Sequence, residues 1–325
     1  MFSDLIVAYL FLGGTGAGGC VVVAFLALLA DPLPLEAALA RKMRSSAADP
    51  WRRFFAAMQL AILGALLLGM LCLIADLGRP DRLLLILFHP APTYLAFGAW
   101  ALIACFALSA FSLLIWTGAV RASRRVMVLV SIVSIVAGVA VMLYAGLMLA
   151  DMRAVPVWNT PLLWVVFVLS ALSCGIALVL VAAFASGSVG PFARTLMRLS
   201  KVDAVIILLE AIAGIAFLVS AWQQAGGLVG PTDGTSYAAQ ESLEALVAGP
   251  LAALFWVGFA FIGMAVPFVQ DIILGRTSGT AVSAAMLRRR SLLMVSAAAC
   301  VLIGGAILRL LVVAMASHPL LGVPL

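Results

Sequence analysis

The residues of this protein best suited to chemistry lie in one polar stretch, Asp76 to Trp100, between two apolar segments. Within seven residues it carries four charges, in a sequence that is only 10% charged: Asp76, Arg79, Asp81 and Arg82. His89, one of two histidines, follows them. Three prolines keep a helix from running through, because proline has no N–H to donate: Pro80, Pro90 and Pro92. Such groups can accept hydrogen bonds and relay protons, but a capped loop at a helix end would contain them too.

The elements around this stretch are apolar helices. The sequence is 66% hydrophobic, and runs long enough to cross about 30 Å of hydrocarbon recur along its length. We expect an all-α, polytopic integral membrane protein, a single eight-helix domain over 1–325. The expected spans are 4–30, 53–75, 94–117, 126–150, 161–185, 201–222, 246–270 and 291–316. No basic segment precedes the first apolar run, so we expect a retained helix and not a cleaved signal peptide.

The basic residues indicate the orientation of the spans. Fifteen of the 19 Lys and Arg residues lie in alternate connections, within 31–53, 118–125, 186–201 and 271–290. Cytoplasmic loops carry such an excess, so we expect both termini, and the stretch from Asp76, to face away from the cytoplasm of a bacterial inner membrane. The connection 223–245 contains acidic residues and glycines but no basic residue, and we expect a flexible outer loop.

Several cofactor classes are disfavoured. The five cysteines are far apart and form no Cys-x-x-Cys pair, so we expect no iron–sulfur cluster in this protein. His89 and His318 lie outside the spans or at their ends, which argues against a haem. The spacing Gly14-x-Gly16-x-x-Gly19 is that of a dinucleotide fingerprint. However, it lies inside an apolar helix and not in a βαβ unit, so we interpret it as a close helix-packing surface.

Polar residues within the spans are the other functional candidates, because ionisable groups are costly in hydrocarbon. Asp203 and Glu210 are seven residues apart and share a helix face, about 10 Å apart along the axis. The two carboxyl groups predict a proton path. Alternatively, Glu210 could stay protonated and hydrogen-bond a neighbouring helix, and Asp203, which is close to Lys201 in the sequence, could be a paired residue at the start of a helix. Gln59 is better explained by an interhelical hydrogen bond. Arg309 lies towards the outer end of its span, where its long side chain can snorkel to the membrane surface.

The sequence resembles the NrfD/PsrC-type family of quinol-interacting membrane subunits of polysulfide, nitrite and related molybdopterin oxidoreductases. The resemblance rests on Tyr9-Leu-Phe-Leu-Gly-Gly14, Asp76-Leu-Gly-Arg-Pro80, the segment 93–100, and Tyr144-Ala-Gly-Leu147 followed by Pro156-Val-Trp-Asn-Thr-Pro161. With eight spans in this order, it covers essentially the whole sequence.

The resemblance implies a subunit with no redox centre of its own, which binds menaquinol or ubiquinol near the outer face. It implies an iron–sulfur partner subunit and, beyond that, a molybdopterin subunit. The quinol-binding part is then mainly helices 1–4, within 1–160. Tyr144, His89 and Asp76 are the groups best suited to accept hydrogen bonds and protons from quinol, and Tyr9 is a further quinone-binding candidate. Arg79 would orient Asp76 or contact the partner, whose interface would include Asp81 and Arg82.

Two other classes remain open. A secondary transporter would show an internal repeat and spans broken near the midplane. We find no convincing repeat between 1–160 and 161–325, and the prolines cluster in the connections. A purely structural membrane anchor would make the polar residues incidental.

The charge distribution yields a first prediction. A periplasm-active reporter fused after Leu325, or inserted near Gly230, should be active, because the basic connections hold the opposite ends of the spans in the cytoplasm. A cytoplasm-active reporter at the same two positions is the control. If only the cytoplasmic reporter works at either place, the orientation is reversed.

Overall fold

The computed structural model describes residues 3–30, 50–77, 94–152, 155–276 and 284–316. Within these ranges, eight helices are long and apolar enough to cross a membrane, and no strand occurs. The all-α fold with eight candidate spans is confirmed for the part of the protein that the structure describes.

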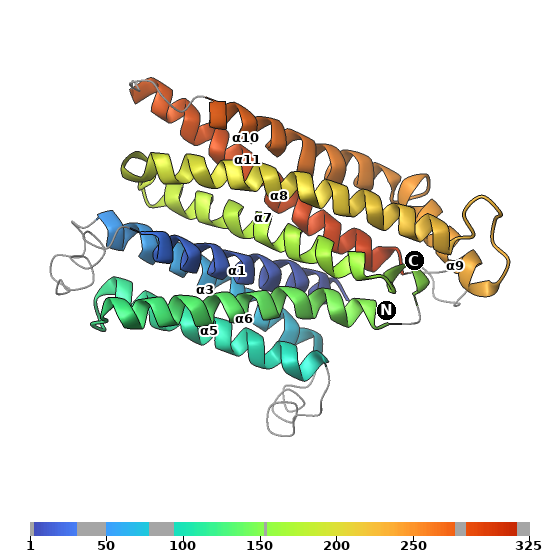
Figure 1. Cartoon of the computed structure of the whole chain (residues 1–325), viewed down its shortest axis with the longest axis horizontal. Helices are drawn as coiled ribbons and strands as arrows, with labels where there is room; N and C mark the ends of the chain where they lie inside the picture. Colours follow the sequence, from blue (N-terminus) through green and yellow to red (C-terminus); the bar gives the residue numbers. More distant parts are fainter. Residues whose placement is uncertain (1–2, 31–49, 78–93, 153–154, 277–283, 317–325) are drawn as a thin grey trace.

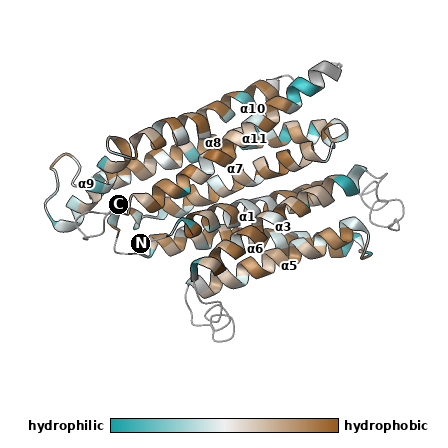
Figure 2. Cartoon of the chain, turned by 180° about the vertical axis from the view of Figure 1, so that it is seen from behind, coloured by the Kyte–Doolittle hydropathy of each residue, from teal (hydrophilic) through white to brown (hydrophobic). Residues whose placement is uncertain are grey.

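The helices form two groups that follow sequence order (Figure 1). The first group contains α1 (Asp4–Leu29), α3 (Pro50–Leu77), α5 (Tyr94–Thr117) and α6 (Arg124–Ala150). The second contains α7 (Pro161–Ala185), α8 (Val189–Gln224), the π-helix η3 (Leu254–Ala265) continued by α10 (Val266–Arg276), and α11 (Ala284–Ala314). The groups meet where α1 packs against α7. Apolar residues cover most of the helix lengths, and polar residues gather towards their ends (Figure 2).

The two ends of the bundle differ. We call the end where α1 begins and α11 finishes the terminal end, and the opposite end, where α3, α6, α8 and α11 begin, the basic end. At the basic end, Ser123 accepts a hydrogen bond from the N–H of Val126 and caps α6. Gly118 ends α5 with a φ of 82°, and a methyl group there would lie 2.7 Å from Nη2 of Arg52. Glycine is therefore required at position 118 for two reasons: its backbone has a positive φ, and a side chain would have no space.

Helix α1 is the central helix, and its glycines allow that position. A methyl group on Gly18 would collide with the carbonyl oxygen of Ala171 on α7, and one on Gly175 would collide with the backbone of Gly18. One on Gly16 would lie 2.7 Å from the Leu66 side chain of α3. The interpretation of the glycine run as a close helix-packing surface is confirmed, since backbones touch where side chains are absent.

The segment predicted as a flexible outer loop contains a helix, α9 (Gly234–Val247), so that expectation was wrong. Asp233 accepts from the N–H of Ser236, and the Ser236 hydroxyl lies 3.0 Å from the N–H of Asp233, which forms a capping box. Ala239, Ser242 and Leu246 provide a buried face, and α9 packs on α8.

The cap of α9 depends on a charged carboxylate. The Ser236 side chain and N–H, followed by the Thr235 hydroxyl, hold the pKa of Asp233 below its ordinary value of 3.8. Because the pKa of Asp233 is lowered in the folded protein, the charged cap contributes its full stabilisation at pH values above the ordinary pKa. This stabilisation is lost as the pH falls through the lowered pKa of the folded protein.

Helix α8 also differs from its predicted span, because it begins at Val189 and not near 201. Its first turns bend at Phe192, where the backbone leaves helical values. The seventh span is irregular as well. Its first twelve residues form η3, and Gly263 of η3 packs directly on Gly304 of α11.

The α1–α7 contact generates the second prediction. Gly18→Ala should lower the unfolding free energy by about 1–3 kcal/mol, because the new methyl group meets a backbone carbonyl that has no room to move. Gly64→Ala on α3 is the matched control, since a methyl group there has nothing within 4 Å. Thermal unfolding in detergent measures both. Equal midpoints for the two variants would mean that the close contact does not contribute to stability.

Candidate functional site

Two of the predicted site residues meet at the terminal end of the first group. Tyr9 of α1 and Tyr144 of α6 are buried, with 4% and 1% of their surfaces exposed. Their hydroxyl groups lie close enough to interact with each other. A tyrosine pair of this kind presents one hydroxyl hydrogen whose acceptor can change when a ligand arrives.

Glycines shape the space around the pair. A methyl group on Gly98 of α5 would collide with the Tyr144 ring, so the ring occupies the space that this glycine leaves. A methyl group on Gly13 would lie 3.4 Å from the Tyr9 ring. The segment that begins α5 and the glycine run of α1 therefore set the positions of both rings.

Asp76 lies at the same end, in the last turn of α3, and is partly exposed. The Ser3 hydroxyl, just before α1, donates a hydrogen bond to Oδ1 of Asp76. Ser3 is six residues from Tyr9, about 9 Å along a helix axis. Asp76, Tyr9 and Tyr144 thus reach the terminal end from three helices. The other predicted residues of this site, Arg79, Asp81, Arg82 and His89, lie outside the described residues.

A second polar cluster surrounds Glu210 of α8. Nη1 of Arg309, on α11, donates to the Ser170 hydroxyl at 2.7 Å and to the Gly305 carbonyl oxygen at 2.8 Å. Glu210 interacts with the same Ser170 hydroxyl and with the charge of Arg309. The expectation that Arg309 snorkels was wrong: it is 1% exposed, because α7 and α11 supply hydrogen-bond acceptors inside the bundle. A methyl group on Gly14 of α1 would lie 3.4 Å from Nη2 of Arg309.

Asp203 is the next carboxyl along α8, and it is 2% exposed. The Ser173 hydroxyl of α7 donates to its Oδ1 at 2.7 Å. The predicted shared face is confirmed, since Asp203 and Glu210 are both buried towards the second group. Lys201 is exposed, and the structure shows Ser173 as the hydrogen-bond partner of Asp203.

Sequence reasoning missed Asp271 of α10. It is 1% exposed, and its charge acts on Asp203. Ser200 faces it, but neither the Ser200 hydroxyl nor the Asp271 carboxyl oxygens make a hydrogen bond of good geometry within the described part of the protein. The signal was present, since Gln270-Asp271 interrupts an apolar run at the expected end of the seventh span, 246–270.

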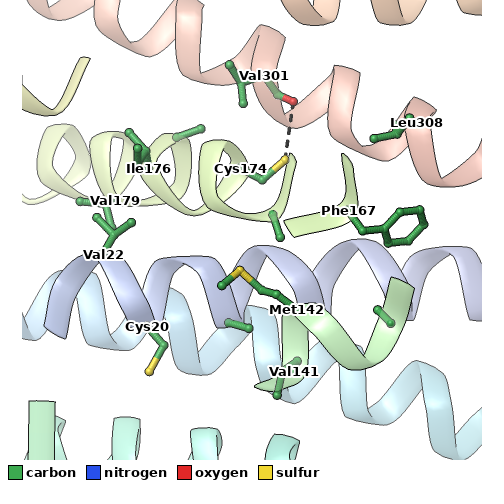
Figure 3. Close-up of a cluster of buried hydrophobic side chains, with 14 of the residues drawn as sticks. Cys20, Val22, Val141, Met142, Phe167, Cys174, Ile176, Val179, Val301 and Leu308 are labelled. Carbon is green, nitrogen blue, oxygen red and sulfur yellow. Dashed lines mark hydrogen bonds between the residues drawn. The ribbon is translucent and has the colours of Figure 1, made fainter. Parts of the chain in front are cut away.

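Cys174 and Gln59 are two further polar side chains inside the bundle. Cys174 of α7 donates to the Val301 carbonyl oxygen of α11 at 3.8 Å (Figure 3). Gln59 is buried, but its Oε1 has no hydrogen-bond partner among the described residues, so the expected interhelical bond is not seen at that atom.

An apolar cavity of about 440 Å³ lies between α8, η3 and α11. Among the described residues, Glu210 is the only ionisable group that lines it, and Phe255, Phe259 and Phe268 contribute aromatic rings. Such a cavity suits an uncharged chain and would exclude an anion. A search of the described residues for three or more His, Cys, Asp or Glu side chains arranged to hold a metal ion finds none.

Comparisons with known proteins agree with this architecture. The family model described as "Polysulphide reductase, NrfD" matches residues 1–318. The C subunit of the polysulfide reductase of Wolinella succinogenes is 27% identical over 287 residues, which span 83% of this protein and 82% of that subunit.

The Arg309 cluster generates the third prediction. Ser170→Ala removes the hydroxyl that Arg309 and Glu210 share, so it should destabilise the fold by about 1–3 kcal/mol through unsatisfied buried groups. The control is Ser296→Ala, an exposed serine that bonds only its own helix. Thermal unfolding distinguishes them. If Ser170→Ala is as stable as the control, the cluster does not depend on this hydroxyl.

Proposed function

Because the protein belongs to the NrfD polysulphide reductase family, and is therefore a multi-pass membrane subunit of an oxidoreductase, we propose that it exchanges electrons with quinol at Tyr9, Tyr144 and Asp76. In the oxidising direction, quinol gives up two electrons and two protons and becomes quinone. The electrons pass to iron–sulfur clusters of a partner subunit, and the protons pass to groups of this protein.

The paired tyrosines carry this proposal. A quinol has two ring oxygens, and each must form a hydrogen bond with a group that can accept its proton. The Tyr144 hydroxyl lies beside that of Tyr9, so the pair offers a hydrogen-bonding group for a ring oxygen. Asp76 lies at the same end, and its partly exposed carboxyl suits a proton acceptor with access to water.

His89 and Arg79 complete the proposed pocket. His89 would serve the second ring oxygen, and Arg79 would orient Asp76. Both belong to 78–93, the segment that follows Asp76 in the sequence. Reduction of quinone would use the same groups in reverse, and menaquinone and ubiquinone share the two ring oxygens that these groups would bind.

Other subunits must supply the redox centres. The relative is one subunit of a multi-subunit reductase. We propose that an iron–sulfur subunit docks at the terminal end, over Arg79, Asp81 and Arg82, and connects to a molybdopterin subunit. Charges at the rim of such an interface mainly steer and orient association.

A proton path from the basic end would accompany the quinol site. Asp271 and Asp203 act on each other electrostatically, and Asp203 acts likewise with Glu210. Ser170 then connects Glu210 with Arg309. Arg309 faces Gly14, five residues or about 7.5 Å of helix from Tyr9. The order of these groups from α10 to α1 supports a path that ends near the tyrosine pair.

The fourth prediction tests the quinol site. Tyr144→Phe keeps the ring against Gly98 but removes the hydroxyl, so quinol-dependent turnover of the assembled complex should fall about tenfold or more. Turnover with an artificial electron donor that bypasses quinol should stay unchanged. Tyr237→Phe is the matched control, since this tyrosine is exposed on α9.

His89→Ala is a second variant for the same site. If Tyr144→Phe and His89→Ala both leave quinol turnover intact, the quinol pocket lies elsewhere, and a purely structural role of these residues becomes the better explanation.

The fifth prediction concerns Glu210. Glu210→Gln keeps a hydrogen bond to Ser170 but cannot titrate, so in proteoliposomes either turnover or proton movement per electron should drop while the complex still assembles. Glu244→Gln, exposed on α9, is the control. Two unaltered measurements would remove Glu210 from the mechanism and leave it with a structural hydrogen-bonding role.

A further inference from the structure

A groove of about 430 Å³ lies at the basic end, between the two helix groups. We call it the basic-end groove. Its walls come from α1, α3, α7 and α8. Its aliphatic lining includes Leu26, Leu172, Ile176 and Ile206. Most of the lining side chains are aliphatic or aromatic, so the body of the groove is apolar.

Aromatic rings make a firm wall at the end of the groove nearest the start of α3. The Phe54 ring stacks on Phe192, with centroids 4.0 Å apart, and the Trp51 ring meets Phe192 edge-on at 5.1 Å. These contacts connect α3 of the first group with the bend of α8 in the second. The groove is therefore shaped by direct contacts across the interface between the two helix groups, which we call the seam.

The polar groups of the groove are confined to the same end. Among the lining residues, Arg198 and Thr195 of α8 have polar side chains, together with the indole N–H of Trp51. Arg198 is exposed and Thr195 is half-buried. Arg194 and Lys201 lie one turn before and one turn after Arg198 and are also exposed. Arg198 thus places a positive charge in this end of the groove, and the other two basic residues flank it on α8 without lining the groove.

The dimensions match one leaflet of a bilayer. From Arg198 to Ile206 is eight residues, about 12 Å along α8, against about 15 Å for half of the hydrocarbon core. The side of the groove opens past Phe25, Leu29 and Val202, which are 54%, 67% and 52% exposed. In a membrane these residues face the lipid tails, so an acyl tail can enter the groove sideways.

We propose that the basic-end groove binds an anionic phospholipid, with its phosphate on Arg198 and Thr195 and one acyl tail between α1 and α8. A guanidinium and a hydroxyl suit phosphate oxygens, and basic pockets between membrane helices bind anionic head groups. The apolar remainder suits the tail. The lipid braces the two helix groups at the end opposite to the tyrosine pair, and this assignment does not depend on quinol chemistry.

The test uses the purified, delipidated protein and added phosphatidylglycerol or phosphatidylcholine of the same tail length. Native mass spectrometry counts the bound lipid, and thermal unfolding measures its effect. The wild-type protein should take up one phosphatidylglycerol, preferred about fivefold over phosphatidylcholine, and unfold at a higher temperature with it. Arg198→Gln should remove this preference. Arg194→Gln, one turn away but outside the groove, should retain most of it.

A second pair of variants tests the position of the acyl tail. Val202→Trp fills the groove and should abolish uptake of the tightly bound lipid, whereas Val205→Trp should not, since Val205 is equally exposed but does not line the groove. Equal affinity for both lipids, equal effects of Arg198→Gln and Arg194→Gln, or equal effects of the two tryptophans would overturn the proposal. No uptake by the wild-type protein would also overturn it, and would leave the groove to another protein segment or a second copy.

Discussion

The backbone contact between α1 and α7 is the constraint on which the rest of the structure depends. Helices in lipid gain little from burying apolar surface against each other, so they are held by close packing and polar contacts. At Gly18 and Gly175 the two backbones approach so closely that a single methyl group on either would collide with the other helix. This contact joins the two helix groups and places α1 beside α3, α6 and α7.

The close contact between α1 and α7 also determines where polar side chains can be placed inside the bundle. Because α1 lies tightly on α7, the Arg309 side chain of α11 can reach both Ser170 and the surface of Gly14. A buried guanidinium is costly unless its hydrogen bonds are satisfied; here α7 and α11 supply the acceptors of Nη1, while Nε has no partner among the described residues. The carboxyl of Glu210 then lies beside a positive charge. The polar contacts of Arg309, Ser170 and Glu210 therefore depend on the close packing of α1 and α7.

The two ends of the seam present different chemistry. At the terminal end lie the hydroxyl groups of Tyr9 on α1 and Tyr144 on α6 and the carboxyl group of Asp76 on α3. At the basic end, arginine side chains and aromatic rings surround an apolar groove. For the proposed electron transfer to a partner subunit at the terminal end, the two helix groups should keep a fixed position relative to each other. A lipid held at the opposite end of the seam would serve that purpose without touching the reacting groups.

The sequence by itself determined the features that depend on local pattern: the number of spans, the close-packing surface of α1, and the shared face of Asp203 and Glu210, which follows from seven-residue spacing. The start of α9 was also readable, since Asp233 and Ser236 have capping-box spacing, but glycines around them suggested a loop. The tertiary structure alone decided the contacts between distant segments. Arg309 meets Ser170 across 139 residues, and Tyr9 of the first helix meets Tyr144 of the fourth. Helical periodicity predicts on which face of its helix a side chain lies. It does not predict which other helix packs against that face, because the neighbouring helix is determined by packing across the whole bundle.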